Sequence, residues 1–72
     1  MDKRNIIGKQ VKNIRKNKKI TQEQLTARLH VLGIEIDRTM ISKIENQTRH
    51  ILDYELKAIA EALSIDINKL FE

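Results

Sequence analysis

Apolar residues recur at helical spacing along this chain, beginning in residues 6–17. Isoleucine or valine occupies positions i, i+4 and i+7 of this segment, which predicts a helix that buries one stripe. The stripe consists of Ile7, Val11 and Ile14. Gly8 lies in the first turn of this helix and weakens it by about 1 kcal/mol relative to alanine. We therefore expect Gly8 to permit a close backbone approach.

The stretch Thr21-Gln22-Glu23-Gln24 marks the start of a second helix, expected over residues 21–32. It matches a capping box, with Thr21 as N-cap and Gln24 at the third helical position. The apolar stripe that follows is made of leucines, Leu25, Leu29 and Leu32. Gly33 then favours a stop, because glycine adopts the left-handed conformation at little cost.

A third helix is expected over residues 37–47, with the Asp37 carboxylate capping its free N–H groups. Ile41 and Ile44 are three residues apart, so a helix buries both on one face. The opposite face is left with hydrogen-bonding side chains, those of Arg38, Thr39, Ser42 and Lys43.

Two more helices complete the pattern. One is predicted from about Asp53 to Leu63, and a short one follows Asp66. The apolar residues of these segments are Leu56, Ile59, Ala60 and Leu63, followed by Ile67, Leu70 and Phe71, which turn inward or towards a partner. The chain has no proline and only two glycines, so residues 1–72 are expected to form one compact all-α domain of five helices.

The net charge of +4 is unevenly distributed. Residues 1–22 carry eight lysines and arginines against one aspartate, whereas residues 51–72 carry five acidic residues against two lysines. Such asymmetry indicates a polyanionic partner. Charge alone supports equally well a lysine-rich surface that is merely solvated.

The sequence lacks the residue combinations of known catalytic and metal sites. It has no cysteine, no glycine-rich phosphate loop and no His-Glu-x-x-His. His30 and His50 are twenty residues apart and neither has metal-ligand spacing with an acidic partner. His30 is expected to contact the carbonyls that end its helix. No enzyme, cofactor, metal or small-molecule substrate is therefore expected.

No signal-peptide pattern and no membrane-spanning apolar run is present, and the absence of cysteine fits a reducing compartment. The chain is therefore expected to be a soluble cytoplasmic protein without a membrane association.

Two short helices joined by a turn, the second exposing polar residues at its start, are typical of helix-turn-helix recognition of DNA. The major groove, about 12 Å wide, admits one α-helix. Arg38 can donate two hydrogen bonds to guanine, and Thr39 offers a hydroxyl and a methyl group. Ser42 and Lys43 follow one turn along. We interpret these four residues as base-reading, the alternative being a solvated face on which Asp37 pairs with Arg38.

Several landmarks together carry a family resemblance: Ile14-Arg15, TQEQL at 21–25, ISKIEN at 41–46, ALSID at 62–66 and Leu70-Phe71. Over residues 6–71 the chain resembles the Cro/lambda-repressor-type helix-turn-helix domain, also called the XRE family. The resemblance implies a lambda-repressor-like fold and an ion pair between Arg15 and Glu45. It also implies that Gln22 clamps a DNA phosphate.

Further phosphate contacts follow from the same resemblance and from the basic charge. They are expected for the lysines after the first helix and for the loop after the third, namely Lys16, Lys18, Lys19, Asn46, Gln47, Thr48 and Arg49. For the lysines, a solvated loop is the alternative.

Two departures from the family pattern affect the turn between the second and third helices. Thr26 occupies a position where a small residue is usual, so its hydroxyl should bond back to a carbonyl or face the turn. From Leu25 to Ile41 the chain has about five more residues than the short turn of the family requires. A longer second helix or a wider turn is expected, covered by Leu32, Ile34 or Ile36.

These features predict a sequence-specific double-stranded DNA-binding transcription regulator, expected to act as a repressor. One recognition helix reads few base pairs, so a homodimer on a two-fold operator is expected, with half-sites about 34–36 Å apart and Leu70 and Phe71 as candidate dimer contacts. The alternative is a protein-interaction module or an antitoxin component with the same fold, binding its partner through residues 66–72.

Overall fold

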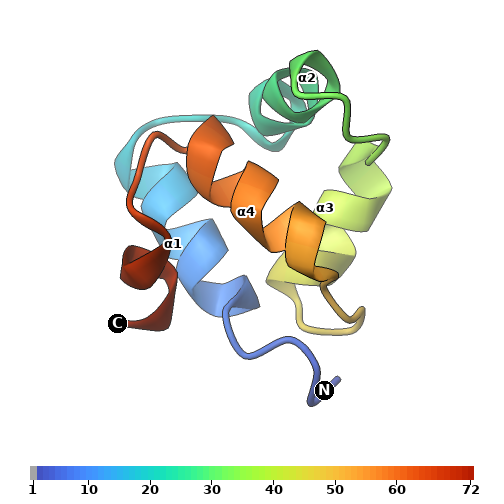
Figure 1. The fold of residues 1–72 in the computed structure, drawn as a ribbon, viewed down its shortest axis with the longest axis vertical. Helices are drawn as coiled ribbons and strands as arrows, with labels where there is room; N and C mark the ends of the chain where they lie inside the picture. The colour runs from blue at the N-terminus through green and yellow to red at the C-terminus, as the bar shows by residue number, and fades with distance from the viewer. Residues whose placement is uncertain (1) are drawn as a thin grey trace.

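The computed structural model describes residues 2–72, which form four α-helices and one short 3-10 helix (Figure 1). The elements are α1 Gly8–Asn17, α2 Gln22–Val31, α3 Arg38–Glu45, α4 Asp53–Ala62 and η1 Ile67–Phe71. No strand occurs in this part of the chain. The all-α prediction is confirmed, but the fifth element is a five-residue 3-10 helix and not an α-helix, because its backbone closes i→i+3 bonds such as Lys69 N–H to Asp66 O.

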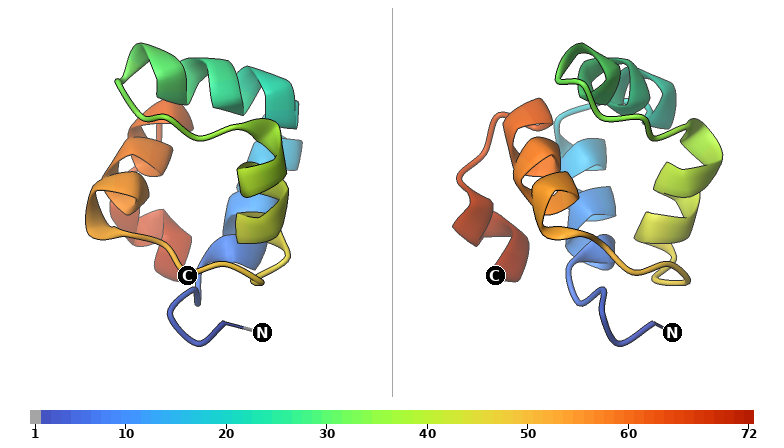
Figure 2. Two further views of the ribbon diagram at one scale, coloured as in Figure 1. Left: turned by 90° about the vertical axis from the view of Figure 1, so that its right-hand side faces the viewer. Right: turned by 45° about the vertical axis from the view of Figure 1, so that its right-hand side comes forward.

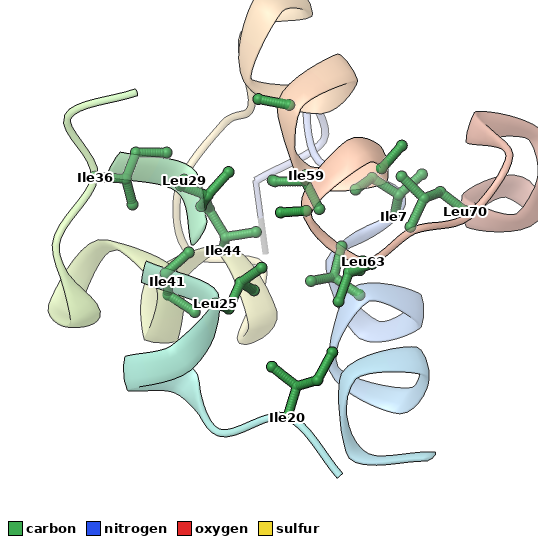
Figure 3. Close-up of a cluster of buried hydrophobic side chains, with 14 residues drawn as sticks. Ile7, Ile20, Leu25, Leu29, Ile36, Ile41, Ile44, Ile59, Leu63 and Leu70 are labelled. Atoms are coloured by element: carbon green, nitrogen blue, oxygen red, sulfur yellow. The ribbon is translucent and has the colours of Figure 1, made fainter. Parts of the chain in front are cut away.

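The core is filled from all five elements and from the turn before α3 (Figure 3). Its largest fully buried apolar side chains are Leu25, Leu29, Ile36, Ile41, Ile44, Ile59, Leu63, Leu70 and Val11. The expectation that Leu32 is buried is wrong. Leu32 is 41% exposed because α2 ends at Val31, and Ile36, 1% exposed, is the turn residue that enters the core.

The additional residues between α2 and α3 widen the turn and leave α2 short. Residues 32–37 connect the two helices, and the Nε2–H of His30 donates across the turn to the Ile36 carbonyl at 2.9 Å. His30 was expected to contact the terminal carbonyls of its own helix, but it contacts the turn instead. The hydroxyl of Thr26 bonds back to the Gln22 carbonyl at 2.8 Å, as predicted.

The segment before α1 is held against the end of α3 by a buried amide. Asn5 is 1% exposed, and its Nδ2 donates to the carbonyls of Ile44 and Arg49 at 2.8 and 2.9 Å. Its Oδ1 accepts from the Gly8 N–H, so α1 begins at Gly8 and not at residue 6. A Cβ atom at Gly8 would overlap the Ile44 carbonyl oxygen, which confirms the predicted close approach.

All four α-helices end in the same turn, in which the residue after the C-cap is left-handed and two further N–H groups return to helix carbonyls. Those left-handed residues are Lys19, Gly33, Gln47 and Ser64. The left-handed conformation costs a residue with a side chain about 1–2 kcal/mol. Three of the four helix ends are therefore stabilised by their hydrogen bonds at some conformational cost.

A second buried contact connects the α3–α4 loop to α4. The guanidinium of Arg49 donates to both carboxylate oxygens of Glu55 at 3.0 and 2.8 Å, and the Leu52 N–H donates to the same group. Burial acts to raise the pKa of Glu55, but the hydrogen bonds from Arg49 and Leu52 outweigh it, and the pKa lies below 4.5. Glu55 therefore contributes stability in its charged form.

Ser64→Gly should raise the free energy of unfolding by about 0.5–1 kcal/mol. Glycine removes the conformational cost of holding a residue with a side chain at φ 56°, and this gain exceeds the larger backbone entropy that glycine loses on folding. Gly33→Ala should lower it by a similar amount, since Gly33 has φ +83° and no atom within 4 Å of an added Cβ. Urea unfolding of the two variants measures both effects. A fall in stability for Ser64→Gly would show that its side chain makes a contact that matters.

Acid should destabilise the protein through Glu55. Folding lowers the pKa of Glu55 from its ordinary value of 4.5. The ionised carboxylate therefore stabilises the folded protein at a pH above 4.5, and this stabilisation is lost as the pH falls through the lower pKa of the folded state. Glu55→Gln should be less stable at neutral pH and should lose less stability between pH 5 and pH 3. Chemical unfolding across this range tests the prediction, with the exposed Glu35→Gln as a control that keeps the wild-type pH dependence.

Candidate nucleic-acid interface

The N-terminal turn of α3 carries an exposed polar face. The Asp37 carboxylate accepts from the Met40 N–H at 2.8 Å, so the helix begins at Arg38 as the cap predicts. Successive helical residues are about 100° apart, which places residues 38, 39, 42 and 43 within an arc of about 140°. Arg38, Thr39 and Lys43 are exposed and Ser42 is half-buried, whereas Ile41 and Ile44 are fully buried behind them.

The first turn of α2 meets this face. Gln22, Arg38, Thr39 and Ser42 together line a shallow hollow of about 190 Å³, and Lys43 lies one turn farther along α3. Every lining side chain can donate a hydrogen bond. The structure thus brings one predicted phosphate-binding residue beside three of the four predicted base-reading residues.

A buried ion pair fixes the position of α3 relative to α1. Arg15 Nε donates to Glu45 Oε2 at 2.6 Å and Nη2 donates to Oε1 at 3.0 Å, with side chains 8% and 1% exposed. The third guanidinium nitrogen donates to the Ile20 carbonyl at 2.8 Å. Such a bidentate pair allows little rotation of either side chain.

Gln22 joins this pair, because its Nε2 donates to Glu45 Oε1 at 3.0 Å. An amide nitrogen carries two hydrogens, so one N–H of Gln22 is left for an acceptor outside the protein. The end of α1, the start of α2 and the end of α3 consequently meet at one carboxylate. In the left view of Figure 2, α1, the start of α2 and α3 lie on the right-hand side of the molecule.

The remaining predicted phosphate residues divide into two groups. Lys16, Lys18 and Lys19 at the end of α1, and Asn46 and Thr48 after α3, are exposed. Gln47 is half-buried and donates to the Asn5 carbonyl. Arg49 differs, because its guanidinium is directed inward to Glu55 and only 17% of its side chain is exposed. Arg49 therefore holds the loop in place, and its phosphate contact stays a prediction.

Two residues that position this surface were not identified from the sequence. Asn5 lies in a polar N-terminal stretch, and its backbone acceptors are 39 and 44 residues away. Glu55 stands three residues after Leu52, and a leucine at that position gives no capping-box signal. Neither residue carries a local pattern that reveals its contacts.

Residues 2–72 hold no group of three or more acidic or histidine side chains able to bind a metal ion. None of its helices is both long enough and apolar enough to cross a membrane.

Comparison with known proteins identifies the family. The sequence profile described as Helix-turn-helix matches residues 11–70, which includes α2, the turn and α3. No curated protein and no solved structure gives a match to the chain. On the profile match, supported by the arrangement of α2 and α3, the chain belongs to the Cro/lambda-repressor-type helix-turn-helix family of DNA-binding transcription regulators.

Proposed function

We propose that this protein binds double-stranded DNA sequence-specifically, with α3 in the major groove, and represses transcription by occluding a promoter. The observation that carries the proposal is the exposed polar turn at the start of α3, backed by Ile41 and Ile44. A helix held from one side only can enter a groove with its free side. The family is generally non-enzymatic, which agrees with a binding role.

Base reading is assigned to the exposed residues of α3. Arg38 at the first helical position can form a bidentate contact with guanine O6 and N7, and Thr39 can contact thymine or a phosphate. Ser42 and Lys43 would contact the neighbouring base pair one turn along. None of the four side chains forms a hydrogen bond within residues 2–72, so each can exchange water for a DNA acceptor.

Phosphate binding is assigned to residues that surround this face. Gln22 and the free N–H groups of the first turn of α2 offer donors at the positive end of a helix dipole. The exposed side chains that would complete the contact are Lys16, Lys18, Lys19, Asn46 and Thr48. These contacts would set affinity and register without reading sequence.

A homodimer on a two-fold operator is part of this proposal. One copy measures 28 × 23 × 20 Å and presents a single recognition helix of eight residues. Half-sites of a dimer are about 34–36 Å apart, or a multiple of this distance.

The second candidate is a protein-interaction module or an antitoxin component. Phe71 in η1 is 55% exposed, which would suit a protein partner. A protein-interaction module alone leaves the polar start of α3 without a role, so we favour DNA; an antitoxin could also bind DNA, and co-purification of a toxin would identify it. Selection of bound duplexes from random DNA by the purified protein tests the choice. Enrichment of a common sequence supports our proposal, and retention without any sequence preference, or no retention, contradicts it.

Lys43→Ala should weaken binding to the selected site by about 1–3 kcal/mol and relax the base preference at one position. Lys18→Ala should reduce the slope of log K against log salt by about 0.9, because one phosphate contact is lost. Fluorescence anisotropy at several salt concentrations measures both quantities, with the exposed Lys57→Ala on α4 as control. If Lys43→Ala weakened binding equally on every sequence, Lys43 would be a phosphate contact.

Variants of the Arg15–Glu45 pair should distinguish its effect on stability from its effect on DNA binding. Arg15→Met alone leaves a buried carboxylate and should cost about 3–5 kcal/mol of stability, whereas Arg15→Met with Glu45→Leu should recover most of it. The double variant still lacks the acceptor that orients Gln22, so its DNA affinity should stay low on all sequences. Urea unfolding and anisotropy together test this, and full recovery of DNA affinity would contradict the role assigned to Gln22.

A further inference from the structure

We propose that a hollow beside the widened turn binds a small uncharged molecule that combines an apolar body with an amide group. This turn hollow has a volume of about 390 Å³ and is lined by residues 33–36, Met40, Arg49, Leu52, Tyr54 and Glu55. The inference goes beyond the proposed function and does not depend on it, because none of the four base-reading residues lines the hollow.

The turn hollow owes one wall to the long connection between α2 and α3. Residues 33–36 form this wall, and they belong to the stretch that exceeds the short turn of the family. The other walls come from α3 and from the start of α4. In the left view of Figure 2, the turn, α3 and α4 lie around this region, on the face turned to the viewer. The additional length of the turn therefore builds part of a site.

The walls of the turn hollow are mainly apolar. Tyr54 is 57% and Leu52 39% exposed, while Ile34 and Met40 are half-buried against the core. Small-molecule sites are hollows of about 300–1,000 Å³ with apolar walls and a few polar groups. The turn hollow lies within this range, and an aromatic or branched body of a ligand could cover its apolar side chains.

The backbone of the turn offers unpaired hydrogen-bonding groups to such a ligand. Within residues 2–72, the N–H groups of Glu35 and Ile36 donate to no protein acceptor, and the carbonyls of Gly33, Ile34 and Glu35 accept from no protein donor. Backbone groups without a protein partner bind water. An amide carries both a donor and an acceptor, so it can replace water along this segment, as an added strand does at the edge of a sheet.

The polar part of the lining has donors to spare. Arg49 uses three of its five guanidinium N–H groups, two on the Glu55 carboxylate and one on the His50 carbonyl. Two N–H groups of Arg49 are therefore left for a carbonyl oxygen of a ligand. The pairing with Glu55 holds the guanidinium in place, so these donors need no ordering when a ligand binds.

The charges of the lining favour an uncharged ligand. Arg49 and Glu55 neutralise each other, and the exposed Glu35 leaves one negative charge beside the hollow. A carboxylate ligand would be repelled by Glu35. An ammonium ligand would meet the unused donors of Arg49 and of the turn, which require an acceptor. A neutral amide avoids both conflicts.

The neutral amide N-acetyl-L-phenylalaninamide is the probe for this site, because it joins an aromatic ring to two amide groups. A ligand of this size should bind with a Kd of about 0.1–1 mM. Tyr54 is the only tyrosine of the chain and there is no tryptophan, so tyrosine fluorescence reports directly on the turn hollow. Saturable changes in this fluorescence, and in the NMR amide signals of residues 33–36 and 52–55, are the expected result.

Two exposed aromatic residues form a matched pair of variants. Tyr54 is 57% and Phe71 55% exposed, but Phe71 does not line the turn hollow. Tyr54→Ala should weaken binding of the probe about 3–10-fold through loss of an aromatic contact, and Phe71→Ala should bind it as the wild type does. NMR titration measures both, with circular dichroism to verify folding. An equal loss in the two variants would contradict the assignment of the site.

A change of charge tests the class of ligand. N-acetyl-L-phenylalanine has a carboxylate in place of the terminal amide and should bind the wild type about 3–5-fold more weakly, because like charges near a surface repel by this amount. Glu35→Gln should reduce the difference and leave binding of the amide unchanged. Tighter binding of the carboxylate than of the amide overturns the assignment of an uncharged ligand.

The outcomes bear on this inference separately from the proposed function. Saturable NMR shifts confined to the lining residues support the site. Absence of saturation well above the expected Kd, or shifts centred on another part of the surface, overturns it. Neither result affects selection of duplexes by the free protein, so DNA recognition stands if the site fails. A protein that binds the amide probe in the turn hollow but selects no DNA supports this inference and overturns the proposed function.

Discussion

The geometry of the interface depends on the carboxylate of Glu45. Burying two charges is expensive, and such a pair is tolerated only where hydrogen bonds satisfy both partners. Here Glu45 accepts from Arg15 through both oxygens and from Gln22, while Arg15 also donates to the Ile20 carbonyl. The pair therefore defines the relative positions of α1, α2 and α3, and its replacement by apolar groups would keep the packing but leave the Gln22 amide without its acceptor.

The C-terminal turn of α3 receives most of the polar contacts, which leaves the N-terminal turn free. Asn5 binds the Ile44 carbonyl, and the absence of a side chain at Gly8 lets α1 approach the same atom closely. Beyond α3, Arg49 and Glu55 hold the loop against α4. At the other end, Asp37 caps the helix with its own side chain and Ile41 enters the core. An eight-residue helix held in this way can present its first turn to a ligand without losing its position.

Local signals predicted the features that depend on neighbouring residues, and they failed where partners are distant in sequence. The caps at Thr21 and Asp37 and the stop at Gly33 follow from a few adjacent residues, and the structure has each of them. The buried role of Asn5 and the inward direction of Arg49 depend on how α1, α3 and α4 pack together. Ile36 and not Leu32 enters the core because of where α2 ends, and hydrophobic periodicity locates a helix end only to within several residues. For the same reason the exposed polar face of α3 was predictable, whereas the contact of Gln22 with Glu45, 23 residues away, was not.

The widened turn between α2 and α3 lengthens the connection and still keeps α3 in place. Its start is fixed by the Ile34 N–H, which donates to the Leu29 carbonyl, and its end by the contact of His30 with the Ile36 carbonyl. Between these points Glu35 is exposed, and the side chain of Ile36 enters the core immediately before the Asp37 cap. The additional length is therefore placed on the outside of the molecule, while Ile36, two residues before α3, is buried in the core. The start of α3 is consequently set by Ile36 and by the Asp37 cap, and its end by the contacts of Glu45, so the helix is positioned at both ends behind its exposed polar face.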